Sequence, residues 1–334
     1  MIKIAINGFG RIGRAAFKII LENNYNIEVV AINDLTDNET LAHLLKYDTV
    51  YGVYEKKVKA SAKGISVDGK EYKVLAERDP HNLPWKDFNI DVVLECTGFF
   101  TKKEDVEKHI LAGAKRVIIS APSKSDDIGT YVLGVNASKI PKNEKIISNA
   151  SCTTNSVAPV MRVLEENFGI QKALMTTIHS YTADQNLVDG PHKDLRRARA
   201  AAQNIAPTTT GAAIAAAKTI PSLKNKFDGI AVRVPTLAGS LSDITALLKM
   251  NTTVENINKA FRESTKKKEF KNVLDVTADP IVSSDIIKNS FSTIVDLSMT
   301  KVVDKNLVKI IAWYDNEWGY ANRLAELAMK VGRI

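Results

Sequence analysis

The stretch Gly8-Phe9-Gly10-Arg11-Ile12-Gly13 decides the fold of the first half of the chain. It directly follows an apolar run, Ile2 to Ile6, that is typical of a buried strand, and it opens a helical pattern over Arg11 to Leu21. In this context the first glycine permits a tight turn, the second lets a pyrophosphate approach the backbone, and the third lets the helix pack closely on the strand. Free N–H groups at the start of the helix attract the anion. The sequence therefore predicts a dinucleotide-binding strand–turn–helix unit.

An acidic residue after the second expected strand, Ile27 to Ile32, indicates which dinucleotide binds. Asp34 stands 21 positions after Gly13, where a carboxylate can bond a ribose 2′-hydroxyl. The same carboxylate would repel a 2′-phosphate, and its neighbours Asn33 and Leu35 supply no positive charge. We therefore expect NAD rather than NADP. The alternative is a glycine-rich turn beside a surface aspartate.

The remainder of the first half continues to alternate apolar runs with helical stretches. Strands are expected at Ile90 to Leu94 and at Arg116 to Ile119, with a charged helix near Lys102 to Leu111 between them. Buried strands that alternate with helices are typical of a doubly wound parallel sheet, which is a Rossmann-type α/β domain. The polar segment 51–86 contains Asp68-Gly69 and is expected to add hairpins to this sheet.

After Ser148-Asn149 the pattern changes to longer strands with fewer helices between them. A helix is expected from Cys152 to about Asn167, and another should begin with Thr252 as its N-cap, because Thr252 to Glu255 has capping-box spacing. A final helix covers Gly319 to Val331. Strands are expected at Ala173–His179, Gly229–Val234, Ile244–Met250, Phe291–Leu297 and Leu307–Tyr314. This order favours an α+β domain with a mixed or antiparallel sheet.

Length and composition narrow the class of protein. A chain of 334 residues is long enough for about two domains. Its 45% hydrophobic and 25% charged residues exclude a disordered or collagen-like chain. No apolar window reaches the ~18 residues of a membrane helix, and the opening segment is not expected to be a signal peptide. Because the chain has two cysteines, we expect no disulfide framework, no metal site and a reducing, cytoplasmic setting.

The formal charge of +8 arises from 46 Lys and Arg against 38 Asp and Glu. A solvated surface rich in lysine explains it most simply. Nucleic-acid binding would need concentrated charge, and Lys266-Lys267-Lys268 is the one run in the sequence. An anionic small-molecule substrate fits better, because it requires only a few well-placed arginines.

Cys152 is the candidate nucleophile. It lies in the polar turn Ser148 to Asn155, at or near the first position of the expected helix, where free N–H groups and the helix dipole should lower the pKa of its thiol. The alternative is a small buried cysteine, the usual fate of free cysteine. Cys96 is the last residue of the apolar run Val92 to Cys96 and is expected to be such a buried, protonated thiol.

His179 is the candidate base among the five histidines. It closes the strand pattern Leu174 to Ile178 and precedes the polar stretch Ser180-Tyr181-Thr182. Sites form at such strand ends, and a histidine there could activate a thiol. These residues alone do not establish that His179 meets Cys152.

Six separate motifs occur in one order along the chain. They are Asn7–Arg14, Ala150-Ser151-Cys152-Thr153-Thr154-Asn155, His179–Thr182, Pro207–Ala213, Arg233-Val234-Pro235 and Trp313–Tyr320. In this order they resemble the phosphorylating glyceraldehyde-3-phosphate dehydrogenase family, and the resemblance covers essentially all 334 residues.

The resemblance implies a role for each matching residue. Cys152 would be the nucleophile and His179 the base that activates it. The substrate phosphate and the attacking inorganic phosphate would be bound by Ser151, Cys152, Thr153, Thr182, Arg197, Thr210, Gly211 and Arg233. The dinucleotide would be held by the turn glycines Gly8, Gly10 and Gly13, and by Arg11, Ile12, Asp34, Arg78, Ser120 and Asn316.

The resemblance also implies an organisation and an activity. An NAD-binding domain, residues 1–151, would be joined by the final helix, 318–334, with 152–317 as the catalytic domain and a homotetramer as the assembly. The activity would be the NAD-dependent oxidative phosphorylation of D-glyceraldehyde 3-phosphate to 1,3-bisphosphoglycerate, a step of glycolysis and gluconeogenesis. Two alternatives stay open: the sister activity on erythrose 4-phosphate, and a catalytically retired nucleic-acid-binding protein.

Overall fold

The computed structural model describes residues 1–23 and 25–334, which form two compact units. The first unit comprises residues 1–131, 139–150 and 321–334, and the second comprises 132–138 and 151–320. Relative to the expected division, segment 132–138 falls in the second unit. There the Gly134 and Val135 carbonyl oxygens accept hydrogen bonds from Arg162 Nη1 at 2.7 and 3.2 Å.

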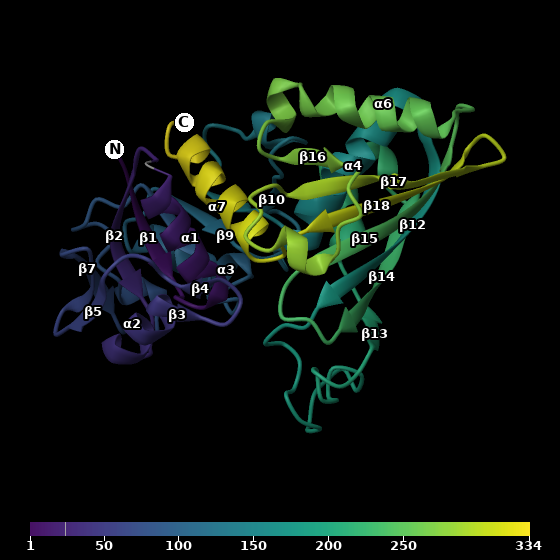
Figure 1. Ribbon diagram of the computed structural model, residues 1–334. Helices are drawn as coiled ribbons and strands as arrows, with labels where there is room; N and C mark the ends of the chain where they lie inside the picture. The colour runs from purple at the N-terminus through teal and green to yellow at the C-terminus, as the bar shows by residue number, and fades with distance from the viewer. Residues whose placement is uncertain (24) are drawn as a thin grey trace. The chain divides into compact units, whose positions relative to one another are not determined.

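A mostly parallel sheet forms the centre of the first unit (Figure 1). Among the described residues its nine strands run in the order β10-β11-β9-β8-β1-β2-β7-β6-β5. Neighbours from β10 to β7 are parallel, whereas β7, β6 and β5 are antiparallel hairpins, as the glycine turns of segment 51–86 predict. The strands are β1 Ile2–Asn7, β2 Ile27–Asn33, β5 Val58–Ser61, β6 Gly64–Val67, β7 Lys70–Leu75, β8 Val92–Glu95, β9 Arg116–Ile119, β10 Gly129–Thr130 and β11 Ile146–Ser148, beside a separate pair, β3 Tyr47–Asp48 and β4 Gly52–Val53.

Helices pack on this sheet through the alternating side chains of its central strands. The helices are α1 Arg11–Glu22, α2 Asn38–Lys46, α3 Lys103–Leu111 and, from residue 321, α7 Trp318–Val331, with short 3-10 turns at Pro80–Asn82 and Ala137–Lys139. On one face Ala5 and Val93 join a buried cluster with Val106 of α3. On the other face Ile6 lies against Gly13 of α1, where a Cβ would come within 3.3 Å of its side chain. Both faces are therefore covered, as a doubly wound sheet requires.

The second unit is built on a mixed sheet (Figure 1). Seven strands run in the order β13-β14-β12-β15-β18-β17-β16 in the described part of the chain, with the β12–β14 and β16–β17 pairs parallel and the others antiparallel. They are β12 Ile170–Ser180, β13 Ala206–Thr209, β14 Phe227–Val234, β15 Ser240–Leu248, β16 Leu274–Thr277, β17 Thr293–Val303 and β18 Leu307–Tyr314. The helices are α4 Cys152–Phe168, α5 Ala212–Thr219 and α6 Val254–Thr265, with 3-10 turns at Pro221–Leu223, Lys268–Phe270 and Ser283–Ile286. The expected mixed α+β domain is confirmed.

The N-cap of α6 is Thr253, so the expectation of Thr252 is wrong by one residue. The Thr253 hydroxyl oxygen accepts a hydrogen bond from Asn256 N at 3.3 Å. Thr252 is buried, and its N–H donates to the Lys305 carbonyl oxygen at 2.6 Å. Pairing with the β17–β18 loop therefore holds Thr252 outside the helix, although its sequence spacing to Glu255 suits a capping box.

Candidate active site

The three glycines of the turn after β1 have the three environments that dinucleotide binding requires. Gly8 has a φ of +91°, and a Cβ there would lie 2.6 Å from Thr97 N. A Cβ at Gly13 would collide with the Gly8 carbonyl oxygen, whereas Gly10 has no atom within 4 Å of its Cβ position. The first glycine thus makes the turn, the third allows close packing, and the second leaves open space for a phosphate at the start of α1.

A cleft of about 700 Å³ opens beside this turn within the first unit. Asp34 lines it, and its carboxylate accepts hydrogen bonds from Phe9 N at 2.7 Å and Thr36 N at 3.0 Å. The other lining residues include Asn7, Gly8, Gly10, Asn33, Leu35, Glu77, Arg78, Cys96, Thr97 and Phe99. Backbone N–H groups, an open glycine and a carboxylate thus surround one concavity, and these residues fit a dinucleotide.

Other residues expected to hold the dinucleotide are placed differently. Arg11 donates to Asp48 at 2.6 Å and lies over the Tyr51 ring, and Ile12 is the second residue of α1. Ser120 directly follows β9. Asn316 belongs to the second unit, where its Oδ1 accepts from Gly239 N at 3.2 Å and Ser240 Oγ at 2.9 Å. The cleft therefore gathers Gly8, Gly10, Asp34 and Arg78, and the dinucleotide-binding roles of these and the remaining residues stay predictions.

Cys152 is the first residue of α4, as the polar turn predicts. Ser151 caps the helix, with its Oγ accepting from Thr154 N at 3.0 Å. Ala150, just before, has a φ of +56°, an unfavourable left-handed conformation that turns the chain sharply from β11 into the helix. The Cys152 Sγ lies 3.4 Å from His179 Nε2, so the structure brings the candidate nucleophile and base together.

His179 lies at the end of β12 and is 4% exposed. Its Nδ1 is 2.6 Å from the Ser180 carbonyl oxygen and 2.6 Å from Arg233 Nη1. These two contacts require opposite tautomers, because the Ser180 carbonyl oxygen can only accept from Nδ1 and Arg233 Nη1 can only donate to it. The tautomer that donates to Ser180 leaves Nε2 free to accept the thiol proton, and it is the one that activation of Cys152 requires. Burial and the positive charge of Arg233 lower the pKa of His179 to about 3, so the imidazole is neutral in the resting site.

The pKa of Cys152 is raised, which corrects the expectation that the helix start lowers it. Desolvation of the thiol is the largest influence, while the Arg233 charge and hydrogen bonds from Thr153 act in the opposite direction. The resting pair is therefore a neutral thiol beside a neutral imidazole. Desolvation also raises the pKa of Cys96 to about 12, and the negative charge of Glu95 adds to the shift. Cys96 is half-buried and lines the cleft, so the expectation of a buried thiol is wrong, whereas its raised pKa agrees with the expected protonated state.

Two guanidinium groups belong to the same part of the second unit. The positive charges of Arg233 and Arg197 both lower the pKa of His179. Arg233 also donates to the Ser180 carbonyl oxygen at 3.0 Å, and Arg197 pairs with Asp184 and donates to Thr208 Oγ1 at 3.1 Å. Arginine pairs bind phosphate well because each guanidinium can donate two parallel hydrogen bonds.

The small residues expected around phosphate occupy chain turns. Gly211 is the N-cap residue of α5, and Thr210 Oγ1 accepts from Ala212 N at 3.2 Å. Thr182 is half-buried just beyond β12. Thr153 is buried in the first turn of α4. Their binding of phosphate stays a prediction.

Tyr314 lies in the site although no sequence pattern gives it a role. It ends β18, is 1% exposed, and its Oη lies 3.0 Å from Thr153 Oγ1 and 2.8 Å from Thr177 Oγ1. Its ring meets His179 edge-on at 6.0 Å between centroids. Its place at a strand end before the polar pair Asp315-Asn316 is the one signal in the sequence that points to it.

A dinucleotide cleft in one unit and a thiol–imidazole pair with two arginines in the other define a dehydrogenase that works through a cysteine. Two family models match the chain: "Glyceraldehyde 3-phosphate dehydrogenase, NAD binding domain" over residues 2–103 and "Glyceraldehyde 3-phosphate dehydrogenase, C-terminal domain" over residues 151–316. The chain belongs to the glyceraldehyde-3-phosphate dehydrogenase family, and the expectation of NAD as cofactor is confirmed.

Curated glyceraldehyde-3-phosphate dehydrogenases match this chain over nearly its full length. The glyceraldehyde-3-phosphate dehydrogenase of Streptomyces coelicolor is 55% identical over 99% of this chain and 98% of its own. Those of Geobacillus stearothermophilus and Thermotoga maritima are 53% and 54% identical, each over 98% of this chain, and over 97% and 98% of their own lengths. Within residues 1–23 and 25–334 no helix has the length and apolarity needed to cross a membrane.

Proposed function

We propose that this protein catalyses the NAD-dependent oxidative phosphorylation of D-glyceraldehyde 3-phosphate to 1,3-bisphosphoglycerate, as a step of glycolysis or gluconeogenesis. The observation that carries the proposal is the 3.4 Å approach of Cys152 Sγ to His179 Nε2, in a site that also holds Arg233. A thiol with an adjacent base can form a covalent bond to an aldehyde carbon. Arginines suit both a phosphate-bearing aldehyde and inorganic phosphate.

In the first step His179 Nε2 takes the proton of the Cys152 thiol as sulfur attacks the aldehyde carbon. The new C–S bond gives a thiohemiacetal, whose oxygen takes that proton. His179 then removes the hydroxyl proton again while the carbon loses a hydride and becomes a thioester. When bound, NAD accepts this hydride and is reduced to NADH. Gly8, Gly10, Asp34 and Arg78 would hold the dinucleotide in the first unit.

In the second step an oxygen of inorganic phosphate attacks the thioester carbon. The C–S bond breaks, the acyl phosphate leaves, His179 returns its proton to the sulfur, and the proton of the hydrogen phosphate is released to solvent. Arg197 and Arg233, with Ser151, Thr153, Thr182, Thr210 and Gly211, would bind the two phosphate groups. The proton transfers to and from sulfur and the thiohemiacetal oxygen thus use Nε2 of His179, which is unprotonated in the resting site.

The direct test is NADH formation from glyceraldehyde 3-phosphate with and without inorganic phosphate, followed by absorbance. We expect sustained turnover only with phosphate, loss of turnover in Cys152→Ser, and retention of most activity in the matched control Cys96→Ser. Sustained turnover without phosphate, or by Cys152→Ser, would refute the proposed reaction. The same assay with erythrose 4-phosphate compares kcat/KM for the two aldehydes; a higher value for the four-carbon sugar would assign the sister activity.

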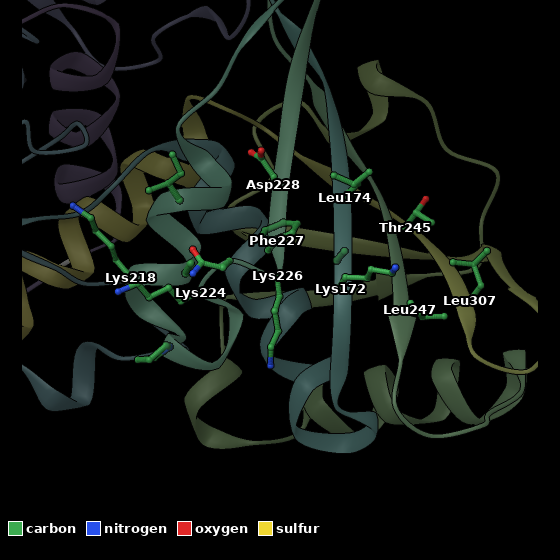
Figure 2. A pocket seen from close by; sticks show the side chains of 15 residues that line it. Lys172, Leu174, Lys218, Lys224, Lys226, Phe227, Asp228, Thr245, Leu247 and Leu307 are labelled. Atoms are coloured by element: carbon green, nitrogen blue, oxygen red, sulfur yellow. The ribbon is translucent and has the colours of Figure 1, made fainter.

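We further propose that the protein is a cytoplasmic homotetramer. The support is an exposed apolar face on the sheet of the second unit, where Leu174, Ile230 and Leu307 are 65%, 50% and 39% exposed. A groove of about 1300 Å³ lies on this face. It is lined by β12, β14, β15, β18 and α5, and Lys172, Lys218 and Lys226 are among its lining residues (Figure 2). Large apolar patches on one sheet face are typical of subunit interfaces, and a second copy of this chain is the proposed occupant.

A further inference from the structure

A chain of buried polar groups runs beneath the dinucleotide cleft, and the reaction described above does not use it. Glu95, the last residue of β8, is 1% exposed, and His109 of α3 is fully buried. A buried carboxylate is costly unless donors surround it. The Glu95 carboxylate is buried at the carboxyl end of a central parallel strand, where ligands bind in such sheets, so its burial there needs an explanation.

The hydrogen bonds fix the protonation state of the pair. Trp85 Nε1 carries a hydrogen and lies 3.0 Å from His109 Nδ1, so Nδ1 accepts and the ring proton is on Nε2. Nε2 is 3.1 Å from Glu95 Oε2 and donates to it. His109 is thus a neutral donor that its tryptophan partner holds in one tautomer.

Three further donors converge on the same carboxylate. Asn7 Nδ2 donates to Glu95 Oε2 at 2.5 Å, and Thr97 N donates to Oε1 at 2.8 Å. The Thr97 hydroxyl also donates to Oε1. Four donors match the acceptor capacity of an ionised carboxylate, whereas a protonated acid would lose part of it. Glu95 is therefore the anionic centre of the network.

From Glu95 the network reaches the lining of the cleft. Asn7 Oδ1 accepts from Asn33 Nδ2 at 2.7 Å. Asn33 pairs with the Glu77 backbone twice, through Nδ2 to the carbonyl oxygen at 2.8 Å and from the Glu77 N–H to Oδ1 at 2.9 Å. Asn7, Asn33, Glu77 and Thr97 all line the cleft, and Asn33 and Glu77 directly precede Asp34 and Arg78.

We propose that Glu95 and His109 are positioning residues for dinucleotide binding. They act through Asn7 and Thr97 on the glycine turn and through Asn33 on the segments that present Asp34 and Arg78. The inference rests on the proposed function only for the identity of the dinucleotide, and binding alone tests it. Because every member is hydrogen-bonded to its neighbours, removal of one acceptor at Glu95 should disturb the whole cleft floor.

The test variant is Glu95→Gln, which keeps the size of the side chain but replaces one acceptor oxygen by an NH2 group that faces existing donors. We expect the Kd of NAD and of ADP-ribose, measured by calorimetry, to rise at least tenfold. At saturating NAD, kcat and the KM for the aldehyde should change less than twofold. If the parent protein showed no dehydrogenase turnover, the proposed function would fail, but a higher Kd for ADP-ribose in Glu95→Gln would still support this inference.

Two further variants separate positioning from a general loss of stability. Val106→Ala removes buried volume from α3 beside the network without touching its hydrogen bonds, and should lower Tm while leaving the Kd of ADP-ribose within twofold of the parent value. His109→Gln can still donate to Glu95 and should bind several-fold tighter than His109→Leu. Any one of three results would overturn the proposal: an unchanged Kd in Glu95→Gln, equally weakened ADP-ribose binding in Val106→Ala, or identical affinities of the two His109 variants.

Discussion

At the scale of single residues, burial first and the Arg233 charge second determine the protonation of the Cys152–His179 pair. Its charge opposes protonation of His179 and favours the thiolate of Cys152, whereas burial disfavours the charged form of both groups. Burial thus favours the neutral thiol and the neutral imidazole in the resting pair. Nε2 of the imidazole faces the thiol, and the two groups titrate as a pair, because a thiolate favours the imidazolium and an imidazolium favours the thiolate.

Replacement of Arg233 by glutamine should raise the pKa of Cys152 further, because the nearest positive charge is removed while desolvation remains. Alkylation of Cys152 by iodoacetamide at pH 7.5 should slow several-fold, and the inflection of its pH–rate profile should move to higher pH. The exposed Arg199, which pairs with Asp189, supplies the control Arg199→Gln. A profile in Arg233→Gln that coincides with the parent profile would contradict this assignment.

The low pKa of His179 also predicts how acid affects stability. Above pH 6.5 the residue is neutral in both the folded and unfolded protein. As pH falls from 6.5 toward 3, the unfolded chain takes up a proton that the folded site rejects, so stability is lost by about 1.4 kcal/mol per pH unit. His179→Asn should therefore lose about 2 kcal/mol less than the parent between pH 7.5 and 5. Urea unfolding of both proteins at pH 7.5 and 5 measures this, and equal losses would show that His179 titrates normally.

At the scale of elements, the glycine turn and α1 depend on two glycines for opposite reasons. Gly13→Ala would place a methyl group on the Gly8 carbonyl oxygen, so we expect a loss of several kcal/mol of stability, on the order of an overpacked core. Gly10→Ala meets open space and should fold normally, yet weaken NAD binding because the methyl group points into the space expected for phosphate. Thermal unfolding and NAD titration of both variants check this; a stable Gly13→Ala protein would refute the packing argument.

The cap of α6 provides a second test at this scale. Thr253→Ala removes the acceptor for Asn256 N and should cost about 1 kcal/mol. If Thr252 were the cap instead, Thr252→Ala would be the variant that loses this stability. We expect Thr252→Ala to leave the amide hydrogen exchange of the first turn of α6 unchanged, with faster exchange there in Thr253→Ala alone.

Local patterns predict most elements because their causes are local. The strand over Arg116 to Ile119 and the helix from Cys152 follow from apolar runs and from a polar capping turn, and both begin at the predicted residue. The cap of α6 was misplaced because a backbone hydrogen bond from Thr252 to Lys305, 53 positions away, overrides local spacing. Likewise the pKa of Cys152 follows from its desolvation in the folded unit, which no helix-start rule contains.

At the scale of the whole molecule, the exposed face of the second unit's sheet is the feature that calls for a partner. Leu174 points from β12 into the groove of Figure 2 and is 65% exposed. Leu174→Lys should place a charge in the proposed subunit interface and shift sedimentation from tetramer to smaller species at micromolar concentration. The control is Leu111→Lys on α3, also exposed, which should leave the tetramer intact. Equal sedimentation of parent and Leu174→Lys would remove this face from the interface.

The division into units is the part of the structure that sequence patterns predict least. Segment 132–138 lies between strands of the first unit, yet it packs with the second through Arg162, and no composition change marks it. The Glu95–His109 network is equally hidden, because its members come from β1, β2, β8 and α3 and meet only after the sheet has formed. By contrast, Cys152 and His179 stand out as single reactive residues at element ends.

The membership of residues 321–334 in the first unit has a consequence for synthesis on the ribosome. Leu324, Leu327 and Ala328 of α7 are fully buried, and Gly332 lies so close to Ile2 of β1 that a Cβ there would come within 2.6 Å of its side chain. These residues are translated after the entire second unit. Part of the apolar surface of the Rossmann domain therefore stays uncovered until these residues have been translated. The second unit is fully translated earlier, so it can finish folding first.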